Sequence, residues 1–104
     1  MPPTVHQEKW VKDLPDGFKM YKVLNTLLGK VVGFSVVLTK DGEGITRYDT
    51  AHDYVHRDVL GRKRPGKVLD KKWYPQMSYS DGFNFADADF EKNYNEYYAF
   101  YENH

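Results

Sequence analysis

The sequence predicts an α+β domain in which an antiparallel sheet of about four strands packs against a long C-terminal helix. Two observations support this prediction. Apolar and polar residues alternate over 31–39, and a second strand-like run over 45–50 follows a tight Asp41-Gly42 turn. Between residues 83 and 101, apolar side chains instead repeat every three or four positions, which is the pattern of an amphipathic helix.

The N-terminal part of the chain has the weakest pattern. Residues 1–16 are rich in proline and show no steady apolar period, so we expect a tail there and a single domain over residues 17–104. Within 18–27, large apolar residues recur every three positions, and Gly29 stands where a helix cap would be placed. Alternation in the same segment fits a strand equally well, and the two interpretations remain open.

A third strand is expected to end at Val59 and Leu60, and a fourth, short strand is expected around residues 68–74. The turn between the second and third strands lies between His52 and His56 and admits two registers. A three-residue loop would place both histidines on one face of the sheet, whereas a two-residue loop would place them on opposite faces.

The C-terminal helix has a clear beginning. Ser78 and Asp81 have the spacing of a capping box, in which a side chain binds the free backbone N–H groups of the first turn. The apolar stripe comprises Phe83, Ala86, Phe90, Tyr94, Tyr97 and Tyr101. We expect this stripe to lie across one face of the sheet.

Composition excludes several classes of function. A chain of 104 residues without cysteine has no disulfide framework, no zinc ribbon and no thiol nucleophile. No window approaches the roughly 20 apolar residues of a membrane span, and the first residues lack the apolar core of a signal peptide. These observations predict a cytoplasmic protein that does not interact with membranes.

The formal net charge is zero, but the charges are unevenly distributed. Seven basic residues lie between positions 57 and 72, and six acidic residues follow position 78. Basic residues in such a run can contact the phosphates of a nucleic acid and supply binding affinity. The predicted RNA-binding residues are Arg57, Arg62, Lys63, Arg64 and Lys67.

Residues 47–58 concentrate the groups that can move protons at neutral pH, with two histidines, two arginines and three aspartates. A pair of close imidazoles can supply one base and one acid, as RNA cleavage by the 2′-hydroxyl requires, and a cation can hold the charge of the transition state. The predicted catalytic residues are His52, His56, Arg47, Tyr48, Asp49 and Asp58. This chemistry needs no cofactor.

Two alternatives compete with catalysis. His52, His56 and a neighbouring carboxylate would make a metal-binding set, but a spacing of four residues is diagnostic only on a helix, so no metal is predicted. The other alternative is a non-enzymatic interaction module that uses its tyrosine-rich helix as a contact surface, for a partner or for a homodimer.

The segment Arg47-Tyr48-Asp49-Thr50-Ala51-His52, with His56 following, resembles small prokaryotic domains that carry an R-Y-D-[TN]-A-H motif. Among these domains, the TumE-like proteins are the toxins of toxin–antitoxin pairs and are suspected ribonucleases. The resemblance implies a toxin-like ribonuclease with RNA as substrate and a cognate antitoxin as partner. It places Arg47, Tyr48, Asp49, His52 and His56 at the functional site.

Overall fold

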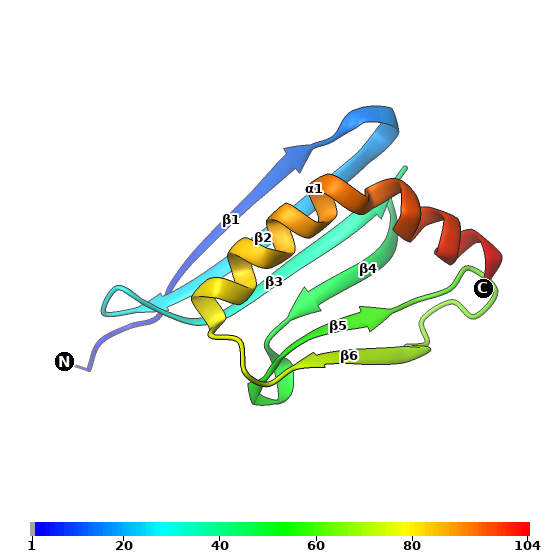
Figure 1. Cartoon of the computed structure of the whole chain (residues 1–104). Coiled ribbons are helices and arrows are strands. Elements are labelled where there is room, and N and C mark those ends of the chain that lie inside the picture. Colours follow the sequence, from blue (N-terminus) through cyan, green and yellow to red (C-terminus); the bar gives the residue numbers. More distant parts are fainter. Residues whose placement is uncertain (1) are drawn as a thin grey trace.

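The computed structural model of the protein describes residues 2–104 as one antiparallel sheet with one helix packed on it (Figure 1). The strands are β1 (His6–Asp13), β2 (Phe18–Leu27), β3 (Lys30–Lys40), β4 (Glu43–Asp49), β5 (Val55–Val59) and β6 (Asp70–Tyr74), and the helix is α1 (Tyr79–Asn103). The strands lie side by side in chain order. The α+β prediction is confirmed, with six strands in place of about four.

The two additional strands come from the N-terminal part of the chain. Residues 6–13, expected as a tail, form the edge strand β1, which pairs with β2 along its full length. Seven of its eight residues are exposed, so it lacks the apolar alternation that reveals a strand in sequence. Segment 18–27 is also a strand, and Leu28 and Gly29 form a two-residue turn with positive φ instead of a helix cap.

The predicted turn between β3 and β4 is present. Asp41 and Gly42 have φ angles of 49° and 86°, and Lys40 pairs with Glu43 on either side of them. Two positive φ angles in succession match the right-handed twist of a hairpin. This hairpin supplies the strand that carries most of the candidate site.

Helix α1 lies across one face of the sheet and encloses the core (Figure 1). Its predicted cap is confirmed, because Ser78 Oγ accepts a hydrogen bond of 3.1 Å from the Asp81 backbone N–H. The helix approaches β5 closely through Gly82, and fully buried Ala86 and Phe90 follow it along the same stripe. The core also contains Phe18, Met20, Phe34, Val36, Leu38, Ile45, Tyr48 and Val55.

Strand pairing determines which residues face the helix. Val36, Tyr48 and Arg57 are aligned across β3, β4 and β5, and buried Val36 and Tyr48 belong to the core beneath α1. Because side chains alternate along a strand, the residues between these positions point to the other side. We call that other side, which α1 does not cover, the open face.

The helix bends at Asn93, where φ is −119° and ψ is 16°. Beyond this bend, the tyrosines of the C-terminal half still pack on the core, including Tyr97 and Tyr101. The tyrosine-rich stripe is therefore turned mainly toward the sheet.

Among the described residues, no helix combines the length and apolar character needed to cross a membrane.

Candidate functional site

The register between β4 and β5 differs from both registers considered from sequence. Asp49 pairs with His56 and Arg47 pairs with Asp58, so six residues, 50–55, lie between the first two partners, and the last of them, Val55, already belongs to β5. His52 lies within this longer loop with φ of 65° and folds back toward the sheet. Its ring centroid is 6.3 Å from that of His56, so the two imidazoles are neighbours although they are not a cross-strand pair.

Asp58 is the centre of the polar residues on the open face, and its side chain is fully buried. One carboxylate oxygen accepts hydrogen bonds from Nε and Nη2 of Arg47, the first at 3.0 Å. The other accepts a bond of 2.7 Å from Lys71 Nζ. Burial alone would raise the pKa of Asp58, but the hydrogen bonds and charges of Lys71 and Arg47 hold it below its ordinary value.

His56 is also buried, and both of its ring nitrogens have partners. Nδ1 lies 3.1 Å from the backbone carbonyl oxygen of Tyr54, which only accepts, so Nδ1 carries a proton. Nε2 lies 3.0 Å from Oδ1 of Asp49 and 3.4 Å from Oδ1 of Asp58. Both carboxylates accept a hydrogen bond from Nε2 when that nitrogen carries a proton.

Asp49 completes the network. Its Oδ2 lies 3.1 Å from Nε of Arg47, and its Oδ1 accepts a hydrogen bond of 2.9 Å from the backbone N–H of Ala51, which orders the loop that carries His52. We call these five residues the charge cluster: Arg47, Asp49, His56, Asp58 and Lys71. In the charge cluster, the two cations and the His56 imidazole all contact the two carboxylates.

Three members of the charge cluster could also ligate a metal. Asp49, His56 and Asp58 each offer an atom, and these atoms lie within 4.8 Å of one another. However, Arg47 and Lys71 already bind both oxygens of Asp58. A divalent ion would have to displace these two cationic side chains, so the arrangement of Asp58 disfavours a metal.

Two aromatic side chains border the cluster, and sequence reasoning missed both of them. The Trp73 ring lies 5.0 Å from that of His56 and is 47% exposed. Tyr54, 50% exposed, meets Trp73 edge to face at 6.5 Å. Trp73 and Lys71 lie opposite His56 and Asp58 in β6, so the strand register identifies them once it is known.

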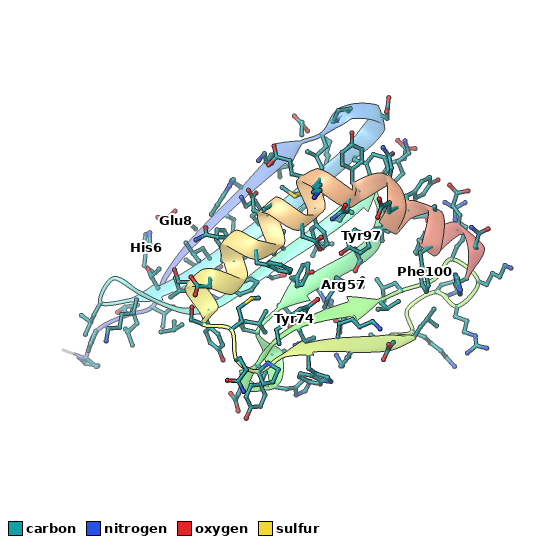
Figure 2. The ribbon with its side chains drawn as sticks, in the orientation of Figure 1. His6, Glu8, Arg57, Tyr74, Tyr97 and Phe100 are labelled. Atoms are coloured by element: carbon teal, nitrogen blue, oxygen red, sulfur yellow. The ribbon has the colours of Figure 1, made fainter. Side chains whose placement is uncertain are left out.

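One predicted catalytic residue and one predicted RNA-binding residue lie on the face of the sheet opposite to this site. Tyr48 is buried beneath the helix, where its hydroxyl donates a hydrogen bond of 2.7 Å to Asp89. Arg57 also faces the helix, with its guanidinium 4.5 Å from the ring centre of Tyr97 (Figure 2). Neighbouring positions in a strand point to opposite sides, so neither residue can act together with His56.

The basic loop is separated from the histidines. It follows the far end of β5 and lies beside the end of the helix, where Arg62 N–H donates to the Tyr101 carbonyl at 3.0 Å (Figure 1). The Arg62 side chain also donates a hydrogen bond of 3.1 Å to the Tyr98 hydroxyl. Lys63, Arg64 and Lys67 share this loop, so they do not lie beside the imidazoles.

A comparison with protein families finds one match, to a model described as a domain of unknown function, DUF7718, over residues 5–104. The chain belongs to the DUF7718 family. The DUF7718 match includes all six strands and the helix, and thus every residue of the charge cluster. Comparisons with curated proteins and with solved structures give no match.

Proposed function

We propose that the protein is a toxin-like ribonuclease whose site lies on the open face. One observation carries this proposal: the exposed imidazole of His52, the cations of the charge cluster and the half-exposed rings of Tyr54 and Trp73 gather on one surface. Bases of single-stranded RNA stack on exposed aromatic rings, and cations hold the phosphates between them. The family resemblance of the R-Y-D-T-A-H segment points to the same substrate.

The two histidines have different roles in this proposal. His56 is only 1% exposed and its nitrogens are occupied, so it orders the carboxylates beneath the surface. His52 is exposed and takes the proton from the RNA 2′-hydroxyl. The 2′-oxygen then bonds to phosphorus, the bond to the 5′-oxygen breaks, and this oxygen takes a proton from water.

Arg47 and Lys71 stabilise the charge that develops on the phosphate during this step. Their side chains are 41% and 32% exposed, so each can meet a substrate while it holds Asp58 from the other side. A toxin of this kind acts on RNA in the cytoplasm, and a cognate antitoxin would cover the open face.

The proposal is tested by incubating purified protein with a short single-stranded RNA labelled at its 5′ end, with and without a chelator. We expect cleavage in both conditions and products that end in a 2′,3′-cyclic phosphate. His52→Ala should reduce the rate by roughly a hundredfold or more. His6→Ala is the matched control, because His6 is an exposed histidine on β1, outside the charge cluster.

Three results would count against a ribonuclease: intact RNA, products with a different end, or equal rates for His52→Ala and His6→Ala.

A further variant, Trp73→Ala, separates RNA binding from the chemical step. Loss of base stacking should raise KM by roughly tenfold, and kcat should change much less.

A second candidate function rests on a different part of the open face. Val11 and Tyr21 pair across β1 and β2 and are 49% and 42% exposed. An uncovered sheet with apolar side chains is suited to pairing with a second copy of the chain. Sedimentation equilibrium tests this homodimer, and Tyr21→Lys should shift the molecules toward monomers if this surface joins the copies.

A further inference from the structure

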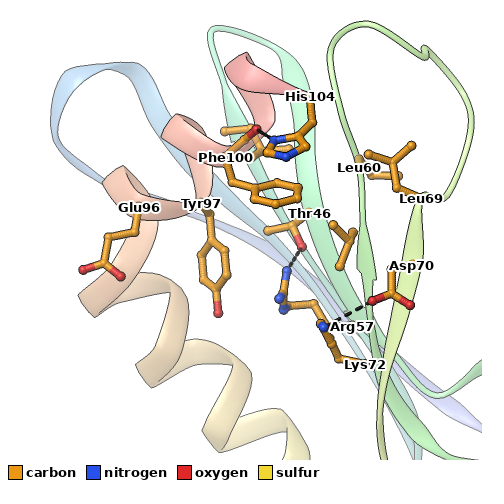
Figure 3. A pocket seen from close by; sticks show the side chains of 12 residues that line it. Thr46, Arg57, Leu60, Leu69, Asp70, Lys72, Glu96, Tyr97, Phe100 and His104 are labelled. Atoms are coloured by element: carbon orange, nitrogen blue, oxygen red, sulfur yellow. Dashed lines mark hydrogen bonds and ion pairs between the residues drawn. The ribbon is translucent and has the colours of Figure 1, made fainter.

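A cavity of about 530 Å³ separates the C-terminal half of α1 from strands β4, β5 and β6 (Figure 3). The part of the helix that borders it follows the bend at Asn93. The cavity lies on the helix face, so the sheet separates it from the charge cluster. Its size is within the range of small-molecule sites.

The cavity walls are mainly apolar. The aliphatic side chains lining it are Ile45, Val59, Leu60 and Leu69. Phe100 of the helix adds an aromatic wall and stacks on His104, with ring centroids 3.8 Å apart. The polar side chains of the lining are Thr46, Arg57, Asp70, Lys72, Glu96 and His104. An apolar molecule placed against the apolar walls would lose contact with water.

Arg57 is the cation positioned in this cavity. Nη1 donates a hydrogen bond of 3.0 Å to Thr46 Oγ1, and the guanidinium stacks on Tyr97, so the side chain is held in place (Figure 3). Its Nε is buried and has no hydrogen-bond partner. Within residues 2–104, Arg57 forms no ion pair, whereas neighbouring Lys72 pairs with Asp70 at 3.2 Å.

A fixed guanidinium without an acidic partner is matched by a carboxylate, which accepts charge-assisted hydrogen bonds from its N–H groups. Asp70 and Glu96 also line the cavity, and their charges oppose a second negative charge on a ligand. We propose that the cavity binds a small organic monocarboxylate with an aromatic or aliphatic body. Arg57 holds the carboxylate, and the apolar walls enclose the body.

Three probes with the same aromatic body test this site by isothermal titration calorimetry. We expect 2-naphthoate to bind, neutral 2-naphthamide to bind at least roughly tenfold more weakly, and dianionic 2-naphthyl phosphate to bind more weakly than the carboxylate. The proposal is overturned if naphthoate does not bind, or if the amide or the phosphate binds as tightly.

A pair of arginine variants locates the binding. Arg57→Gln should weaken naphthoate binding at least roughly tenfold. Arg62→Gln should leave it unchanged, because Arg62 also stacks on helix tyrosines but does not line the cavity. Equal affinities for the two variants would overturn the assignment.

A measurement on the unsubstituted protein makes the test independent of how the variants fold. In NMR spectra, naphthoate should shift the backbone amide signals of Val59, Leu69 and Phe100, which surround the cavity. Signals of His56 and Trp73 on the open face should stay in place. Shifts confined to the open face would overturn the proposal and assign the carboxylate to the charge cluster.

Discussion

Nε2 of His56 and Oδ1 of Asp49 lie 3.0 Å apart because these two residues are direct partners across β4 and β5. The adjacent pair, Arg47 and Asp58, is joined in the same way. Two successive cross-strand pairs therefore build a continuous charged network on the open face, which α1 does not cover. The network replaces an apolar layer there, and its members depend on one another for charge balance.

Removing the central carboxylate should destabilise the fold strongly. Asp58→Asn keeps the shape of the side chain but leaves the cations of Arg47 and Lys71 with one carboxylate instead of two. We expect the free energy of unfolding to fall by about 3 kcal/mol, as for other broken buried pairs. Urea denaturation measures this change.

Asp70→Asn is the matched control for this substitution. Asp70 is an exposed aspartate in the neighbouring strand and pairs with exposed Lys72. Surface ion pairs contribute little, so this variant should unfold close to the wild-type midpoint. Similar losses in both variants would show that Asp58 acts as an ordinary surface carboxylate.

The stabilisation by Asp58 should depend on pH in the acid range. Lys71 and Arg47 hold its pKa below the ordinary value of about 3.9, so the folded protein binds fewer protons at this site than the unfolded chain. Its contribution is complete above about pH 4 and is lost as pH falls through the lowered pKa. The stability gap between wild type and Asp58→Asn should narrow from pH 6 to pH 3, and a constant gap contradicts the prediction.

Sequence patterns predict the elements whose buried faces have a clear period. The β3–β4 hairpin has alternation and an Asp41-Gly42 turn, and the helix has a stripe and a Ser78 cap, so both could be predicted. Strand β1 could not, because an exposed edge strand is held by backbone hydrogen bonds that leave no apolar pattern.

The site was predictable only in part, for a similar reason. Alternation in β4 and β5 correctly groups Arg47 with Asp49 and His56 with Asp58. The loop before β5 contains positive φ at His52 and Asp53, neither of which is glycine, so sequence does not reveal its length. Without that register, the partners of the network in β6 and the separation of Arg57 from it remained hidden.

Alkaline pH should weaken the fold through the tyrosines beneath the helix. Burial, together with a hydrogen bond to Asp89, raises the pKa of Tyr97 to about 12. The unfolded chain releases this proton at about pH 10, so stability is complete below pH 10 and falls as pH rises toward 12. Burial also raises the pKa of Tyr48, so this tyrosine contributes to the same loss of stability at alkaline pH.

Between pH 9 and pH 11, the free energy of unfolding of Tyr97→Phe should therefore fall by less than that of wild type, as measured by urea denaturation. Tyr21→Phe removes an exposed hydroxyl on the open face and should leave the alkaline loss at its wild-type size. If Tyr97→Phe follows the wild-type curve, the proton of Tyr97 is not linked to folding.

The close approach of the helix to the sheet at Gly82 makes a glycine-to-alanine substitution unfavourable there, although alanine usually favours helices. A Cβ atom at position 82 would lie 2.7 Å from Cγ2 of Val55, a fully buried side chain with a stiff branch. Gly82→Ala should therefore destabilise the protein by about 1–2 kcal/mol, despite the helix propensity of alanine. At exposed position 99, propensity alone decides, and Ala99→Gly should cost up to about 1 kcal/mol. Stabilisation by Gly82→Ala in thermal or urea unfolding would show that the helix can move away from β5 without loss of packing.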